Sequence, residues 1–272
     1  LKKMALGGIN DHIGGGFSRY STDAFWKVPH FEKMLYDNAQ LLSAYSIAYK
    51  NQNNELYLET IESIYNFLMT ELKDISGGFY AALDADSEGI EGKFYIWSFA
   101  DFMRITKNDN LLATYFSVTE EGNWEDGHNI LFRTETDDLF CKKNNLTQGN
   151  WKENVIAQNR LLLNERNTRI RPGLDDKILL NWNALLVNGL IEAFRATKNE
   201  KYLNEAISLG KFLLNTFLNS DGSINRTFKN GKSSIAGLLI DYVTFVDALF
   251  NLYQITFDEQ FIKQTTQLLE YI

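Results

Sequence analysis

The strongest constraint on the fold is a repeated alternation of two kinds of helical pattern. Segments that are apolar on nearly every side predict buried helices, and they cover residues 31–49, 178–194 and 238–253. A segment with a single apolar stripe, which predicts a surface helix, follows each of them, over residues 54–72, 199–218 and 258–272. The pattern therefore predicts a series of helical hairpins, each with one inner and one outer helix.

The joints inside these hairpins repeat as well. Residues 54–58, 199–203 and 258–262 share the order Asn or Asp, Glu, any residue, aromatic, aliphatic. The Asn or Asp suits a helix N-cap, and the Glu lies in the first turn, where the helix dipole favours it. This recurrence indicates repeated units of one architecture.

Glycine-rich segments between the hairpins predict short strand–turn–strand excursions at Gly14–Gly16, Gly77–Gly78 and Asp221–Gly222. The region 98–165 has weaker helical patterns and is not assigned to a hairpin. Inner helices wrapped by outer helices, with long loops at one end, are typical of an α/α toroid, and an open superhelical solenoid is the alternative.

Composition narrows the class of partner. The net charge is −8, with 27 basic against 35 acidic residues, so we expect neither nucleic-acid binding nor adhesion to an anionic membrane. No apolar run reaches the roughly 18 residues of a membrane helix. The single Cys141 excludes an intramolecular disulfide and suits the cytoplasm. Because Leu1 and Ile272 both fall within helical patterns, we interpret the chain as part of a longer protein.

The first polar constellation leads into the first buried helix, at whose start we expect His30. On a helix, His30, Lys33 and Asp37 would share one face, and Glu32 and Tyr36 another. A histidine beside carboxylates can act as a general acid or base. Equally, these residues could form an ordinary first turn in which Asp37 pairs with Lys33.

The second constellation is the acidic loop Asp84–Gly92. Its opening imitates a calcium-binding loop, but Tyr95 stands where such a loop needs a bidentate Glu, so we expect no metal. Paired carboxylates on a loop would suit sugar hydrolysis or epimerisation. The alternative is a solvated acidic turn.

Two further polar groups precede buried helices. Asp175 is expected to be an N-cap, which leaves Asp176 to face a cavity with Trp182 and Asn183. Asp241 and Tyr242 open the third buried helix, where a cap is again the simpler interpretation. In a closed toroid the polar starts of the three buried helices would converge on one mouth. His128, in contrast, is interpreted as a surface residue.

Three long strings, at 14–21, 28–38 and 84–89, closely resemble the YyaL-type family, also called the spermatogenesis-associated, thioredoxin-domain-containing proteins. Weaker matches at 171–183 and 241–242 extend the resemblance over most of the chain. The resemblance implies an all-α, (α/α)6 toroid of the six-hairpin glycosidase and N-acylglucosamine 2-epimerase type, with short β-hairpins between helices. It also implies a thioredoxin-like domain N-terminal to the barrel, outside this chain.

Relative to that family, the resemblance makes residues 1–272 a single α/α-barrel domain that is incomplete at both ends. The sequence departs from the family pattern at Gly173 and at Ile240, where an acidic residue commonly precedes the Asp–Tyr pair. The departure at Ile240 weakens the case for a pair of carboxylates there. The family has no established activity.

The leading hypothesis is a carbohydrate-active protein, either a sugar hydrolase or an epimerase-like isomerase, which binds a small carbohydrate without cofactor or metal. Its candidate acid and base groups are His30, Asp37, Asp86 and Asp176. The candidate sugar contacts are His12, Arg19, Tyr20, Trp26, Glu32, Tyr36, Asp84, Glu88, Trp182, Asn183, Asp241 and Tyr242. An epimerase would place two bases on opposite faces of the sugar, which fits His12 and His30. The alternative is a scaffold that binds a glycan, peptide or partner without catalysis.

Overall fold

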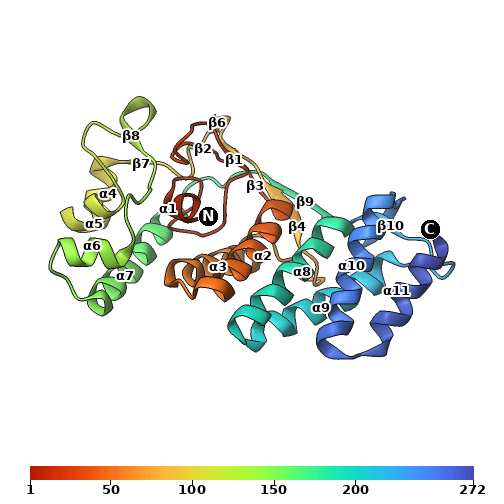
Figure 1. Ribbon diagram of the computed structural model, residues 1–272. Coiled ribbons are helices and arrows are strands. Elements are labelled where there is room, and N and C mark those ends of the chain that lie inside the picture. Colours follow the sequence, from red (N-terminus) through yellow and green to blue (C-terminus); the bar gives the residue numbers. More distant parts are fainter. The chain divides into compact units, whose positions relative to one another are not determined.

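A computed structural model describes all 272 residues, and the chain folds into two compact units (Figure 1). Unit 1 comprises residues 1–33 and 83–173, and unit 2 comprises residues 34–82 and 174–272. The assignment of residues 1–272 to one domain stays a prediction. None of the helices combines the length and the apolar character needed to cross a membrane.

Unit 2 contains the three predicted helical hairpins. Their inner helices are α2 (Leu35–Gln52), α8 (Leu180–Thr197) and α10 (Leu239–Thr256). The outer helices that follow them are α3 (Glu55–Phe67), extended by the π-helical turn η1 (Leu68–Leu72), α9 (Glu200–Phe217) and α11 (Glu259–Tyr271). The side chains of Asn54, Asn199 and Asp258 each accept a hydrogen bond from a backbone N–H two residues later, as N-caps do. The predicted joints are confirmed.

The inner helices pack side by side in the order α2, α8, α10 (Figure 1). A close approach between the first two requires Gly189, because a Cβ there would lie 2.6 Å from the Ala39 carbonyl oxygen. Leu42, Val187 and Phe245 are fully buried. Burial of such side chains stabilises each helix by roughly 1.5–3 kcal/mol per residue, far more than helix propensity does.

The prediction that α10 is buried on every side is wrong. Leu239, Ile240, Val243 and Phe250 are between 42% and 63% exposed. The helix packs against α8, α9 and α11 through Phe245 and its buried neighbours, which cover only part of its circumference. The sequence shows that α10 has apolar residues on every side. Which of them are buried depends on the helices that pack against it.

The largest sheet has five strands in the order β11-β10-β9-β4-β3. Their bounds are β3 (Lys33–Met34), β4 (Tyr80–Leu83), β9 (Leu174–Leu179), β10 (Asn225–Lys229) and β11 (Lys232–Ala236). The glycine-rich excursions are confirmed, since antiparallel bridges close each of them, at Asn10–Phe17, Lys73–Phe79 and Leu218–Ile224. Because residues 174–179 pair as strand β9, the prediction of Asp175 as a helix N-cap is wrong; α8 begins only at Leu180.

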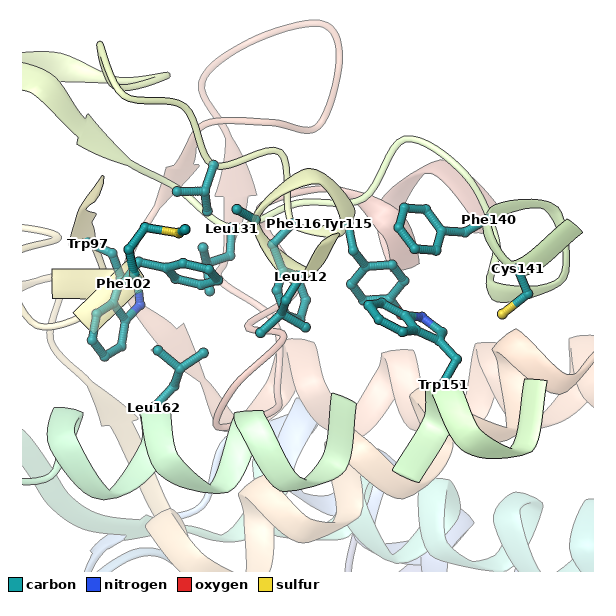
Figure 2. Packing of buried hydrophobic residues seen from close by; sticks show 13 residues of the cluster. Trp97, Phe102, Leu112, Tyr115, Phe116, Leu131, Phe140, Cys141, Trp151 and Leu162 are labelled. Carbon is teal, nitrogen blue, oxygen red and sulfur yellow. The ribbon is translucent and has the colours of Figure 1, made fainter. Parts of the chain in front are cut away.

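Unit 1 surrounds an aromatic core made from the region that the sequence left unassigned (Figure 2). Its helices are α1 (Lys2–Leu6), α4 (Phe99–Ile105), α5 (Asn110–Tyr115), α6 (Asp137–Lys143) and α7 (Gln148–Arg166), with the 3₁₀ turn η2 (Glu125–Gly127). Its two-stranded sheets pair β1 (Tyr20–Ser21) with β2 (Pro29–His30), β5 (Asp86–Ser87) with β6 (Ile90–Glu91), and β7 (Trp97–Ser98) with β8 (His128–Asn129). In the core, the Tyr115 ring contacts those of Phe140 and Trp151 edge-on, at centroid distances of 5.0 and 5.3 Å.

The placement of His30 at a helix start is also wrong. His30 lies in strand β2, opposite Tyr20 of β1, and Lys33 lies in β3. Helix α2 begins at Leu35, so the helical spacing assumed for His30, Lys33 and Asp37 does not apply, nor does that for Glu32 and Tyr36. Strand pairing with residues 20–21 fixes this segment, and no local helical signal reveals it.

A buried ion cluster holds unit 1 together. The Asp11 carboxylate accepts two hydrogen bonds from Arg166 Nη1, both at 2.9 Å, and one from Lys33 Nζ at 2.7 Å. The three side chains are at most 10% exposed. Burial by itself would raise the pKa of Asp11, but the two cations outweigh it and hold that pKa well below its usual range. The cluster joins segments that lie 22 and 155 residues apart.

The Gly14–Gly16 string is explained by this cluster. A Cβ on Gly14 would lie 1.9 Å from Arg166 Nη2, and that guanidinium is pinned by Asp11. Gly15 and Gly16 adopt positive φ angles of 77° and 75°, and the Gly15 carbonyl accepts a hydrogen bond from Lys33 Nζ at 2.8 Å. The glycines thus allow the chain to fold closely around the ion cluster.

We predict that Asp11→Asn lowers the free energy of unfolding of unit 1 by about 3–5 kcal/mol, because it leaves two buried cations without their counter-ion. Urea denaturation followed by tryptophan fluorescence measures this, since Trp26, Trp97, Trp124 and Trp151 all lie in unit 1.

The matched control is Lys142→Gln, which removes an exposed ion pair with Asp138 and should cost no more than about 1 kcal/mol. Equal effects of the two substitutions would contradict the importance of the buried cluster.

Candidate functional site

The acidic loop of the sequence folds as a tight hairpin of strands β5 and β6. Its two turn residues, Glu88 and Gly89, have φ angles of 56° and 72°, which is the combination that a two-residue type I′ turn requires. The Ser87 hydroxyl donates a hydrogen bond of 2.6 Å to the Ile170 carbonyl and so attaches the hairpin to the segment after α7. The hairpin is thereby a fixed platform for its carboxylates.

Asp86 and Glu91 face each other across this hairpin. They are directly opposite in the antiparallel register, so their side chains project from the same face, with Cβ atoms roughly 4.5–5.5 Å apart. Both residues are exposed. The hairpin thus presents two carboxylates on one face, those of Asp86, which is a predicted site residue, and Glu91, which is not. Exposure of both also fits a solvated acidic turn, so a catalytic carboxylate pair stays a prediction.

His30 is held at the same hairpin. Its Nδ1 lies 2.8 Å from Glu91 Oε1, and its ring stacks on Tyr20 with a centroid distance of 4.8 Å and an interplanar angle of 21°. An ionised carboxylate only accepts hydrogen bonds, so the neutral ring must carry its proton on Nδ1. The lone pair of Nε2 is then available to accept a proton, with the ring oriented by Glu91 and Tyr20.

A pocket of about 820 Å³ adjoins this group, within the size range of small-molecule sites. Glu91 lines it together with Pro29, the neighbour of His30. Five carboxylates, two cations, a histidine and a tryptophan are among its lining side chains: Glu88, Glu91, Asp101, Glu125, Asp126, Lys93, Arg169, His128 and Trp124. His128, interpreted from sequence as a surface residue, is partly buried here.

The floor beneath the hairpin is apolar. Phe31 packs between Tyr95, at a ring centroid distance of 5.7 Å, and Trp124, at 5.5 Å. Gly92 ends the hairpin with φ of 74°, and a Cβ there would lie 2.4 Å from the Phe31 ring. The hairpin therefore rests directly on Phe31.

The other candidates of unit 1 have contacts of their own. Arg19 donates to Glu32 at 3.4 Å in a partly exposed pair. The backbone N–H of Asp84 donates to the Gly173 carbonyl at 2.8 Å. Glu88 pairs with Lys93 at 2.7 Å. Trp26 has a φ of 65°. A Cβ added to Gly7 would lie 2.2 Å from the Trp26 carbonyl oxygen, so the two backbone segments pass very close to each other.

His12 is a support for the chain rather than an open contact. Its Nε2 lies 3.2 and 3.1 Å from the carbonyl oxygens of Leu6 and Gly7, which fits a donated, shared hydrogen bond. Burial, reinforced by the nearby charge of Arg133, lowers the pKa of His12 to about 3. A ring that remains neutral and engaged in this way favours a structural role over proton transfer.

The remaining candidates lie in unit 2, and two fully buried ones, Asn183 and Asp241, bond the backbone. Asn183 is fully buried and bonds both the N–H and the carbonyl of Phe79, at 2.8 and 3.0 Å. Asp241, also fully buried, accepts from the Leu238 N–H at 2.8 Å, as a capping residue does. These contacts hold the sheet and the start of α10 in place.

Four other candidates of unit 2 are Tyr36, Trp182, Asp176 and Tyr242. Tyr36 and Trp182 meet edge-on at a centroid distance of 4.8 Å. Asp176 accepts a hydrogen bond from Lys229, which lowers the pKa of this carboxyl. Tyr242 accepts a hydrogen bond from the Ile224 N–H through its hydroxyl at 3.1 Å.

Asp37 lies in the first turn of α2. It and Asp176 stay candidate acid and base groups of unit 2, and the convergence of helix starts on one mouth stays a prediction.

Solved structures identify the fold class. Cellobiose 2-epimerase from Bacillus thermoamylovorans is 17% identical and has a TM-score of 0.57 over 96% of this chain and 50% of its own. A family 76 glycoside hydrolase from a bovine Bacteroides thetaiotaomicron strain is 12% identical, with a TM-score of 0.51 over 95% of this chain and 37% of its own. The chain thus has the (α/α)6 toroid fold class, as predicted.

Sequence relatives then show which proteins the chain resembles. An uncharacterised protein of Caenorhabditis elegans is 32% identical, and human spermatogenesis-associated protein 20 is 31% identical; each alignment covers 98% of this chain. The predicted resemblance to the spermatogenesis-associated family is confirmed. The chain spans 41% and 38% of the length of these two relatives. No profile of a known protein family matches it.

We predict that Gly92→Ala destabilises unit 1 by about 2–4 kcal/mol, because it adds a clash with Phe31 to the strain of a positive φ. Gly89→Ala is the matched control: its φ of 72° is equally unfavourable, but nothing lies within 4 Å of the added methyl group, so it should cost only about 1 kcal/mol. Urea denaturation compares the two. Equal losses would show that the hairpin does not rest on Phe31.

We also predict a stability change with pH that depends on His12. Its folded pKa lies below that of the unfolded chain, so its contribution is complete above about pH 6.5 and is lost as the pH falls toward 3. Between pH 6.5 and 4.5 the wild type should lose about 2 kcal/mol more than His12→Gln, which keeps a donor but does not titrate. Denaturation curves at these pH values provide the measurement, and parallel losses would contradict a buried neutral His12.

Proposed function

We propose that the protein is a carbohydrate-active enzyme whose acid–base group is His30, oriented by Glu91 at the edge of the unit 1 pocket. The observation that carries the proposal is the 2.8 Å hydrogen bond between His30 Nδ1 and Glu91 Oε1 beside that pocket. The similar solved structures, described as a cellobiose 2-epimerase and a glycoside hydrolase, support sugar chemistry as the class of reaction. Their low identity makes this an inference from fold.

In an epimerisation, His30 would act as the base. Its Nε2 would remove the proton from the carbon next to the open-chain carbonyl, and the positive charge formed on the ring would be stabilised by Glu91. The proton must return on the opposite face of the planar intermediate. Asp86, which lies opposite Glu91 in the hairpin, would supply that proton.

In a hydrolysis, the carboxyl pair Asp86 and Glu91 would carry the reaction. Two carboxyl groups about 5–5.5 Å apart act with retention of configuration, and a separation of 6.5–9.5 Å leads to inversion. Glu91, which is positioned by its hydrogen bond with His30, would be the nucleophile or base, and Asp86 would be the acid. Trp124 supplies an aromatic wall for a sugar ring in the pocket.

Two wider features of the proposal come from the sequence. A thioredoxin-like domain would precede this region in the full-length protein, and the protein would act in the cytoplasm, where the buried, unpaired Cys141 stays reduced.

We predict that a panel of reducing mono- and disaccharides contains a substrate whose conversion ¹H NMR detects. In D₂O an epimerase exchanges the C2 proton, whereas a hydrolase releases a new reducing end. His30→Ala and Glu91→Gln should each lower kcat/KM by about 100-fold or more, because general acid–base catalysis contributes 10²–10⁴-fold.

Glu153→Gln, which changes an exposed carboxylate on α7, serves as the control and should retain full turnover. Binding without turnover, unaffected by His30→Ala, would instead support a non-catalytic glycan-binding scaffold. Absence of both binding and turnover across the panel would contradict the carbohydrate proposal.

A further inference from the structure

The charges that line the unit 1 pocket are unbalanced. Of its two cations, Lys93 is paired with Glu88 at 2.7 Å. Arg169 donates to the carbonyl oxygens of Phe94 and Ile96 at 2.9 and 2.7 Å and lies over the Trp97 ring at 4.0 Å. Both cations are therefore already engaged within the protein, and neither is available to bind an anionic ligand.

The carboxylates, in contrast, are only partly neutralised. Asp101 accepts hydrogen bonds from the Ser98 hydroxyl at 2.9 Å and from Arg104, which does not line the pocket, at 3.2 Å. Glu91 is bonded only through the neutral or protonated His30 ring. Glu125 and Asp126, on turn η2, are exposed. The pocket thus has a negative potential that its own lysine and arginine do not cancel.

An apolar surface lies directly beside these carboxylates. Trp124 immediately precedes Glu125. Its ring makes an edge-on contact with Phe31, and its backbone N–H donates a hydrogen bond of 2.9 Å to the His128 carbonyl. A ligand that fits both features has an apolar face to stack on the indole and a positive group to reach Glu125, Asp126 or Glu91.

We infer that the ligand of this pocket is a hexosamine with a free, protonated amino group, and that the pocket discriminates against anionic sugars such as uronic acids. This inference rests on the proposed carbohydrate function and names its substrate class. The C–H face of the sugar ring supplies the stacking surface, and the ammonium group supplies the positive charge. A carboxylate on the sugar would instead be repelled by the unneutralised side chains.

The test compares glucosamine, glucose, N-acetylglucosamine and glucuronate by ligand-observed NMR at pH 6, where the amine is protonated. We expect glucosamine to bind about tenfold more tightly than glucose or N-acetylglucosamine, since each exposed ion pair contributes a few-fold. Glucuronate should bind least tightly, and 0.5 M salt should reduce the preference for glucosamine because the charges are exposed.

The decisive variant is the double substitution Glu125→Gln with Asp126→Asn. Asp126 has a φ of 50°, which Asn tolerates well, so the turn should persist. The variant should lose the tenfold preference while its affinity for glucose changes less than about twofold. Glu120→Gln, an exposed carboxylate outside the pocket, is the matched control and should keep the preference.

The outcomes separate this inference from the proposed function. Glucose binding without a preference for glucosamine, or a preference that survives the double substitution, overturns the hexosamine inference and leaves the carbohydrate proposal standing. Failure of all four sugars to bind overturns the hexosamine inference, and the carbohydrate proposal falls with it only when the wider panel of mono- and disaccharides also shows neither binding nor turnover.

Discussion

The buried ion cluster of Asp11, Lys33 and Arg166 is the interaction on which the candidate site depends. Two cations that are at most 5% exposed would be costly without a counter-ion, so the cluster confines the chain to arrangements that keep Asp11 between them. Lys33 is three residues after His30, and Arg166 ends α7 shortly before Ile170, the residue that accepts the Ser87 hydrogen bond. The same constraint that stabilises unit 1 thus brings the His30 strand and the segment that anchors the acidic hairpin into fixed positions.

This organisation separates two tasks within one recognisable sequence string. Asp11 and the glycines at 14–16 build the ion cluster, whereas Tyr20, a few residues later, stacks on His30 at the surface. In the same way, Gly92 fits the hairpin against Phe31, whereas Glu91, one residue earlier, orients His30. Within one motif, some residues are therefore needed for packing and their neighbours for the proposed chemistry. A motif match alone does not show which residue has which role.

The helical hairpins could be predicted from sequence because their signals are local. Asn54, Asn199 and Asp258 cap the outer helices through contacts that span two residues. The place of His30 has no such local signal, because it depends on strand pairing with Tyr20, ten residues away, and on Glu91, 61 residues away. The strand position of Asp175 is equally non-local, since strand β9 is fixed by its pairing with β10. Glu91 has no comparable local signal: Asp is disfavoured in strands and Glu–Gly is not a strong hairpin turn, so only the folded register shows that Asp86 and Glu91 lie opposite each other.

The proposed role of His30 depends most directly on which ring nitrogen carries the proton, and ¹⁵N NMR of the imidazole reports this without a substrate. At a pH where the ring is neutral, we predict a protonated Nδ1, bonded to Glu91, and an unprotonated Nε2. In Glu91→Gln this preference should weaken toward a mixture of the two tautomers. A wild-type ring protonated on Nε2, or a tautomer ratio that Glu91→Gln does not change, would contradict the proposal that Glu91 prepares His30 for proton transfer.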